Sequence, residues 1–164
     1  AIGAAVAREG KRVICLSGDG SIQMNIQELQ TLVHHQFPVK IFVLDNNGYL
    51  SIRQSQKNFF NFLVGESEAS GVSFPDMVQI GQAYGIPSLQ VEGPDFLPSV
   101  KRVLAAPGPQ ICQVKLDSEQ QFEPKLSSKS LPDGRIVSAP LEDLYPFLER
   151  DELLGNLLVP PMEP

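Results

Sequence analysis

Two short polar clusters hold the residues of this chain that are best suited to bind a charged ligand. The first is Gly18-Asp19-Gly20-Ser21 and the second is Asp45-Asn46-Asn47-Gly48. A carboxylate, a side-chain amide oxygen and a backbone carbonyl are hard oxygen donors, and Mg²⁺ binds such donors together with water and ligand phosphate oxygens. Asp19, Asn46 and the Gly48 carbonyl provide such a set. The two clusters therefore predict a divalent metal site if the fold brings them together.

The first cluster has no basic residue nearby to meet a phosphate group. No Lys or Arg occurs between Val13 and Val39, so the loop lacks the lysine of a P-loop. A helix N-terminus contributes only about 0.3–1 kcal/mol to anion binding, or up to ~2 kcal/mol when partly buried. This is too little to hold a multiply charged phosphate next to Asp19. A metal ion is therefore expected to supply the positive charge.

The elements between the clusters predict how they are positioned. Arg12–Leu16 and Val39–Leu44 are short apolar runs that predict buried parallel strands. The segment between them is an amphipathic helix whose apolar face consists of Ile26, Leu29, Leu32 and Val33. In a parallel βαβ unit both clusters lie at the carboxyl edge of the sheet, where ligands bind. The glycines beside Asp19 allow a sharp turn, and Ser21 would begin a helix that favours an anion at its N-terminus.

The rest of the sequence extends this alternation of helix and strand. Further helices are predicted over 1–8, 48–60, 76–84 and 94–105, and further strands over Ser88–Val91 and Gln110–Leu116. The pattern predicts an α/β domain over residues 1–117, with a doubly wound, mostly parallel sheet and helices on both faces. Residues 118–164 are rich in Pro, Ser and charges and predict an irregular tail. Within it, a turn is expected at Pro132-Asp133-Gly134, and one or two helical turns over Pro140–Glu149.

The run GDGSIQMNIQEL, followed by an asparagine in the context DNNGY 27 residues after Asp19, resembles the metal and diphosphate motif of thiamine-diphosphate-dependent enzymes. It is similar almost residue for residue to the motif of acetolactate synthase-like large subunits. The resemblance covers residues 1–117, and the tail more loosely. It implies the thiamine-diphosphate-binding fold, in the C-terminal cofactor domain of such a subunit.

The resemblance also implies a role for each residue of the two clusters. The three oxygen donors named above would bind Mg²⁺. The cofactor-binding residues would be Gly18, Asp19, Gly20, Ser21, Asn46, Gly48, Tyr49 and Leu50. Among them Gly18, Gly20 and Ser21 would cradle the diphosphate, and Tyr49 and Leu50 would lie against the thiazolium ring. No catalytic residue is assigned, because in this family the glutamate that activates the cofactor belongs to the N-terminal domain of a partner subunit.

The parent enzyme implied by the resemblance decarboxylates a 2-keto acid, by default pyruvate, and transfers the acyl unit to a second carbonyl in branched-chain amino acid biosynthesis. Its active site would lie between the subunits of a homo-oligomer, at least a dimer, and the tail would fold over that site. The chain lacks an initiator Met and opens part-way into the last domain of such an enzyme. We expect an N-terminally truncated fragment that is inactive alone.

Alternatives remain for the substrate and for the class of protein. Ser55 stands where acetolactate synthases typically carry a tryptophan, which leaves a bulkier acceptor such as a keto-sugar open. A Rossmann-type dinucleotide-binding domain would place Gly18 and Gly20 on the phosphate turn and Asp45 on a ribose. Gln23 stands at the position of its third glycine and argues against it. A third alternative is a catalytically silent domain kept for subunit association.

The composition of the whole chain limits its partners. With 164 residues and a formal net charge of −6, the chain is about one domain long and is not expected to bind nucleic acid or an anionic membrane surface. It has no apolar run long enough for a membrane span and no visible signal peptide, so a cytoplasmic protein is expected. Cys15 and Cys112 fall in predicted strands, and we expect buried thiols with no functional role.

Overall fold

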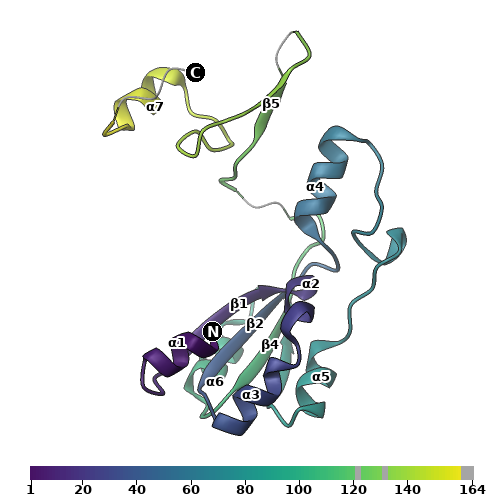
Figure 1. Ribbon diagram of the computed structural model, residues 1–164, viewed down its shortest axis with the longest axis vertical. Coiled ribbons are helices and arrows are strands. Elements are labelled where there is room, and N and C mark those ends of the chain that lie inside the picture. The colour runs from purple at the N-terminus through teal and green to yellow at the C-terminus, as the bar shows by residue number, and fades with distance from the viewer. Residues whose placement is uncertain (121–122, 131–132, 160–164) are drawn as a thin grey trace. The chain divides into compact units, whose positions relative to one another are not determined.

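The computed structural model of the chain describes residues 1–120, 123–130 and 133–159 (Figure 1). Its internal contacts divide the chain into two units, Ala1–Gln120 and Gln121–Pro164. Every residue predicted to bind metal or cofactor lies in the first unit. No helix among the described residues is long and apolar enough to cross a membrane.

The first unit is built on a four-stranded parallel sheet with the strand order β1-β2-β4-β3. The strands are β1 (Val13–Gly18), β2 (Val39–Asp45), β3 (Ser88–Val91) and β4 (Gln110–Lys115). β2 lies between β1 and β4, so its apolar run is buried on both faces, as the sequence predicts for an inner parallel strand. The predicted parallel α/β sheet is confirmed.

Helices cover both faces of this sheet (Figure 1). The elements are α1 (Ile2–Ala7), α2 (Asp19–Ile22), the 3₁₀ turn η1 (Gln23–Asn25), α3 (Glu28–His35), α4 (Leu50–Phe59), the 3₁₀ turn η2 (Glu68–Ser70), α5 (Met77–Ala83) and α6 (Leu97–Ala105). Leu29 and Leu32 of α3 and Met77 of α5 pack on one face of the sheet. Val103 of α6 packs on the other, against Cys112 of β4. The prediction of helices on both faces is therefore confirmed.

The first strand differs from its prediction as a fully buried strand. β1 is an edge strand, and along it Ile14 and Leu16 are 53% and 68% exposed. The alternate residues, Val13 and Cys15, face the core formed with α1 and α3, and Cys15 is half-buried. The reason is the period of a strand, which turns alternate side chains to opposite faces. α6 packs over the inner strands and leaves the outer face of β1 exposed.

The helix predicted after the first cluster is interrupted. The chain forms α2, then η1, and only then α3, although the backbone at Ile22, Gln23 and Gln27 keeps right-handed helical angles. α3 carries the predicted apolar face, with Leu29 and Leu32 buried. α2, which begins within the first cluster at Asp19, is therefore only four residues long, and its dipole adds little to anion binding.

The described residues of the second unit form a small hairpin and one helix. β5 (Ser128–Ser130) pairs antiparallel with β6 (Ile136–Ser138), and α7 spans Arg150–Asn156. The prediction of helical turns over Pro140–Glu149 is wrong, because α7 begins only at Arg150. Pro146 lies inside that stretch, has no N–H to donate and disfavours helix in the residue before it. Of the predicted turn, Asp133 and Gly134 lie between β5 and β6, and Pro132 lies outside the described residues.

Candidate functional site

The fold brings the two polar clusters together at the carboxyl ends of β1 and β2. Gly18 pairs in register with Leu44, so Asp19 follows one strand where Asp45 ends the other. Asp19 is 4% exposed, and its Oδ2 accepts a hydrogen bond of 2.9 Å from the backbone N–H of Gly48. Its Oδ1 accepts one of 2.8 Å from the N–H of Gly20. The carboxylate predicted to bind metal therefore contacts Gly48, the residue whose carbonyl is predicted as a second ligand.

Asn46 has an unusual environment for a buried amide. The residue is 8% exposed, and its Oδ1 has no hydrogen-bond partner among the described residues. A buried polar atom without a partner costs about 1–3 kcal/mol, and such atoms are rare in folded proteins. An amide oxygen with free lone pairs is also a suitable donor for a divalent cation. The environment of Asn46 thus fits the predicted metal site.

The charges around Asp19 favour a bound cation. Burial raises the pKa of the Asp19 carboxyl above its usual value; the N–H groups of Gly48 and Gly20 counteract this effect, and the neighbouring Asp45 carboxylate adds to it. For Asp45, burial alone would raise the pKa, but hydrogen bonds from Lys115, Gln113 and the Asn47 N–H outweigh burial and lower it. Asp45 is thus neutralised by Lys115. The Asp19 carboxylate accepts hydrogen bonds only from backbone N–H groups among the described residues.

A close contact between the clusters explains one of the predicted glycines. A Cβ atom at Gly20 would overlap the ring of Tyr49. The same ring makes an edge contact with Phe74, with 5.1 Å between the ring centroids. Tyr49 is therefore held between the first cluster and the segment before α5. Of the other predicted cofactor residues, Leu50 is buried and Ser21 is exposed.

Gly18 forms the N-cap of α2, and its conformation is one that other residues adopt without strain.

No group of three or more His, Cys, Asp or Glu side chains that could hold a metal occurs among the described residues. The predicted donor set does not require one, because only one of its three donors is a charged side chain. His34 and His35 are exposed in the last turn of α3.

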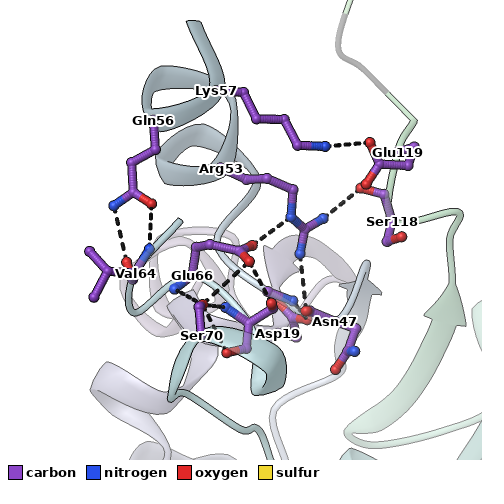
Figure 2. A network of polar contacts seen from close by, with 12 residues as sticks. Asp19, Asn47, Arg53, Gln56, Lys57, Val64, Glu66, Ser70, Ser118 and Glu119 are labelled. Atoms are coloured by element: carbon purple, nitrogen blue, oxygen red, sulfur yellow. Dashed lines mark hydrogen bonds and ion pairs between the residues drawn. The ribbon is translucent and has the colours of Figure 1, made fainter. Parts of the chain in front are cut away.

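Sequence reasoning missed a buried ion pair next to the site. Arg53 of α4 and Glu66 of the following loop are 5% and 2% exposed and form a salt bridge of 2.5 Å (Figure 2). One signal was available in the sequence. Arg53 lies three residues after Leu50 and so shares its helix face, and a charge on a buried face needs a partner.

The chain matches the family described as thiamine pyrophosphate enzyme, C-terminal TPP binding domain, over residues 1–114. This match covers more than half of the chain, which therefore belongs to that family. The family resemblance of the GDGS and DNNGY motifs is confirmed.

Named relatives agree with this assignment. The chain is 35% identical over 145 residues to the acetolactate synthase isozyme 2 large subunit of Escherichia coli (strain K12). This alignment covers 88% of this chain and 25% of that protein. It is 31% identical over 128 residues to the acetolactate synthase large subunit of Cyanidium caldarium, covering 77% and 22%. The chain thus spans about a quarter of the length of these relatives.

Solved structures show the same fold. The thiamine diphosphate-dependent 4-hydroxybenzoylformate decarboxylase of Rhodococcus jostii RHA1 superposes with a TM-score of 0.63 and 30% identity, over 74% of this chain and 23% of that one. The benzoylformate decarboxylase of Polynucleobacter necessarius gives a TM-score of 0.60 and 29% identity, over 74% and 22%. The chain is therefore a C-terminal thiamine pyrophosphate-binding domain of this family, and its sequence is similar to that of acetolactate synthase large subunits.

Proposed function

We propose that this chain binds thiamine diphosphate through a divalent ion, Mg²⁺ in the cell, held by the Asp19 carboxylate, Asn46 Oδ1 and the Gly48 carbonyl. The observation that carries the proposal is the unpartnered, buried Oδ1 of Asn46 in the loop that hydrogen-bonds the Asp19 carboxylate. A cation at this point would give that oxygen a partner. It would also offset the burial that raises the pKa of Asp19.

The remaining cluster residues would contact the cofactor itself. Gly18, Gly20 and Ser21 would cradle the diphosphate, because glycine lets backbone N–H groups come close to the phosphate oxygens. Tyr49 and Leu50 would lie on the thiazolium side. The ring of Tyr49 already packs on Gly20 and Phe74, which supports a fixed orientation at the cofactor. The ion would act mainly as a template that orients the diphosphate.

For the whole protein we propose the chemistry of its acetolactate synthase relatives. The bound cofactor would supply the electron sink for decarboxylation of a 2-keto acid, and the protein would supply position and electrostatics. The acyl unit would then pass to a second carbonyl, which is pyruvate in branched-chain amino acid biosynthesis. Ser55 is exposed on α4 and leaves the second candidate, a bulkier acceptor such as a keto-sugar, open. Assembly as a homodimer with the active site between subunits, and a cytoplasmic location, belong to the same proposal.

Calorimetric titration of the protein with thiamine diphosphate tests cofactor binding. Heat of binding is expected in MgCl₂ and is expected to vanish in EDTA. NAD serves as the control for the dinucleotide alternative. Binding of NAD alone, with no response to thiamine diphosphate in MgCl₂, would overturn the proposal.

Product analysis with the natural full-length protein tests the substrate. Incubation with pyruvate alone is expected to yield acetolactate and CO₂. Formation of product only after a keto-sugar is added would assign the second acceptor. Release of CO₂ with no new carbon–carbon bond under either condition would contradict acyl transfer.

A further inference from the structure

We propose that Arg53 and Glu66 are positioning residues for the metal-binding loop, residues 45–49, because the Arg53 guanidinium of their buried ion pair and the backbone carbonyl of Glu66 fix the peptide groups on the two sides of Gly48. The inference rests on the proposed function and deepens it, since it assigns residues that aim the carbonyl ligand. Neither side chain belongs to the predicted donor set.

The guanidinium of Arg53 joins four parts of the unit (Figure 2). It projects from α4, and its Nε donates to Glu66 Oε2 at 2.5 Å. Its Nη1 donates to the Ser118 carbonyl, just after β4, at 2.5 Å, and its Nη2 donates to the Asn47 carbonyl in the metal-binding loop at 3.1 Å. The planar, forked geometry of arginine allows these three directions at once, which a lysine ammonium on its flexible stem does not reproduce.

The peptide group between Asn47 and Gly48 is held from both sides. Its carbonyl accepts the bond from Arg53 Nη2, and its N–H donates to Asp19 Oδ2 at 2.9 Å. The C=O and N–H of a trans peptide point in opposite directions in one plane. This peptide plane is therefore fixed between the Asp19 carboxylate and the Arg53 guanidinium. Asn47 also has a φ of 57°, in the left-handed region, which needs such support.

The next peptide group carries the proposed carbonyl ligand. The N–H of Tyr49 donates to the backbone carbonyl of Glu66 at 2.8 Å. Since the Gly48 C=O lies in the same plane and points the opposite way, this bond aims the carbonyl away from Glu66. A Cβ atom at Gly48 would overlap the Glu66 carbonyl oxygen and Arg53 Nη2. The pair thus packs directly against the ligand residue.

Glu66 is itself held rigidly. Its Oε1 accepts hydrogen bonds from the Ser67 hydroxyl at 2.5 Å and the Ser70 hydroxyl at 3.3 Å. The Ser70 hydroxyl also accepts the backbone N–H of Glu66 at 2.9 Å. Burial alone would raise the pKa of Glu66, but the bonds from Ser67 and Arg53 and the charge of Arg53 lower it, so the pair is ionised. The loop between α4 and α5 therefore acts as a support for the metal-binding loop.

The chain offers a matched control on the same helix. Lys57 lies one turn after Arg53 on α4 and pairs at 2.6 Å with Glu119, the neighbour of Ser118 (Figure 2). Its side chain is 45% exposed, against 6% for that of Arg53, and no bond joins it to the metal-binding loop among the described residues. Lys57→Met therefore removes a cation from α4 without removing a contact to the loop.

The experiment measures how much MgCl₂ is needed for half-maximal thiamine diphosphate binding by the natural full-length protein. Outer-shell partners of metal ligands typically contribute about 10–100-fold to metal affinity. Arg53→Met is expected to raise the MgCl₂ requirement towards the upper end of that range, and Lys57→Met to leave it within twofold. Near-UV circular dichroism and thermal unfolding without metal are recorded for each variant. They separate a loss of fold from a loss of metal affinity.

Arg53→Lys keeps the charge and the pairing with Glu66, so it tests the proposal even if Arg53→Met fails to fold. It is expected to raise the MgCl₂ requirement about tenfold, with an unfolding temperature close to that of the wild type. A folded Arg53→Lys protein with a requirement within twofold of the wild type would overturn the positioning role. A wild type that binds no thiamine diphosphate at any MgCl₂ concentration would instead overturn the proposed function.

Discussion

Replacing Asn46 by leucine should have opposite effects on the metal-free and the cofactor-bound protein. Asn46 is buried and its Oδ1 has no partner among the described residues. Leucine has nearly the same shape and no polar atom to satisfy. In the metal-free protein, Asn46→Leu therefore removes an unfavourable group. In the cofactor-bound protein it removes one of three proposed metal ligands.

The size of each effect follows from the environment of this one oxygen. An unsatisfied buried polar group costs about 1–3 kcal/mol, so we expect the free energy of unfolding of the metal-free protein to rise by about 1–2 kcal/mol. For a chain of this size that raises Tm by about 2–8 °C. A ligand present at 100 times its Kd stabilises the folded state by about 2.7 kcal/mol. The variant should lose most of that stabilisation.

Differential scanning calorimetry of the wild type and Asn46→Leu, first in EDTA and then with thiamine diphosphate and MgCl₂, measures both effects. The order of the two unfolding temperatures should reverse: the variant should be more stable in EDTA, and the wild type should be more stable with cofactor and MgCl₂. A variant that is less stable than the wild type in EDTA by more than about 1 kcal/mol would show that Oδ1 is already satisfied without metal. An unchanged stabilisation by cofactor would remove Asn46 from the ligand set.

Further substitutions test the candidate site and the sheet that carries it. Asp19→Ala should abolish MgCl₂-dependent retention of thiamine diphosphate on gel filtration, because this carboxylate is the only anionic ligand proposed. Gly20→Ala should destabilise the protein by about 1–3 kcal/mol, because its Cβ would overlap the Tyr49 ring, whereas Gly18→Ala meets only an ordinary contact at 3.7 Å and should unfold in urea like the wild type. Lys40→Met should cost about 2–4 kcal/mol in urea unfolding, because the buried Nζ donates to two backbone carbonyls, at 2.6 Å and 2.5 Å, that would lose their partner. Equal stability of the Lys40 variant would mean that water replaces the ammonium.

The sheet was predictable because its signals are local. β2 is a short, mostly apolar run, β4 carries Ile111, Cys112 and Val114 in a short run, and Leu29 and Leu32 repeat at helical spacing. The exposure of Ile14 and Leu16 was not predictable in the same way. Whether a strand is inner or at an edge depends on the strand order, and the order β1-β2-β4-β3 is a property of the whole unit.

The residues of the candidate site also differ in whether a local sequence signal predicts their contacts. The contact between Asp19 and Gly48 was predictable because both residues follow neighbouring strand ends, in an ordered motif whose geometry the βαβ unit dictates. Arg53 and Glu66 were missed because they lie 13 positions apart in the sequence, across helix and irregular chain. Their pairing depends on how the loop between α4 and α5 folds back, which no periodic pattern in that segment encodes.

The pattern of paired and unpaired carboxylates around the loop explains why an acidic chain can bind an anionic cofactor. Asp45 is paired with Lys115, and Glu66 is paired with Arg53, so each of these negative charges is balanced within the protein. Asp19 is the carboxylate of this group that accepts only backbone N–H bonds among the described residues. One divalent cation bound to Asp19 therefore leaves a net positive charge at the carboxyl ends of β1 and β2. Because the neighbouring carboxylates are already neutralised, that charge is available to a diphosphate, and binding of the cofactor and of the metal should each require the other.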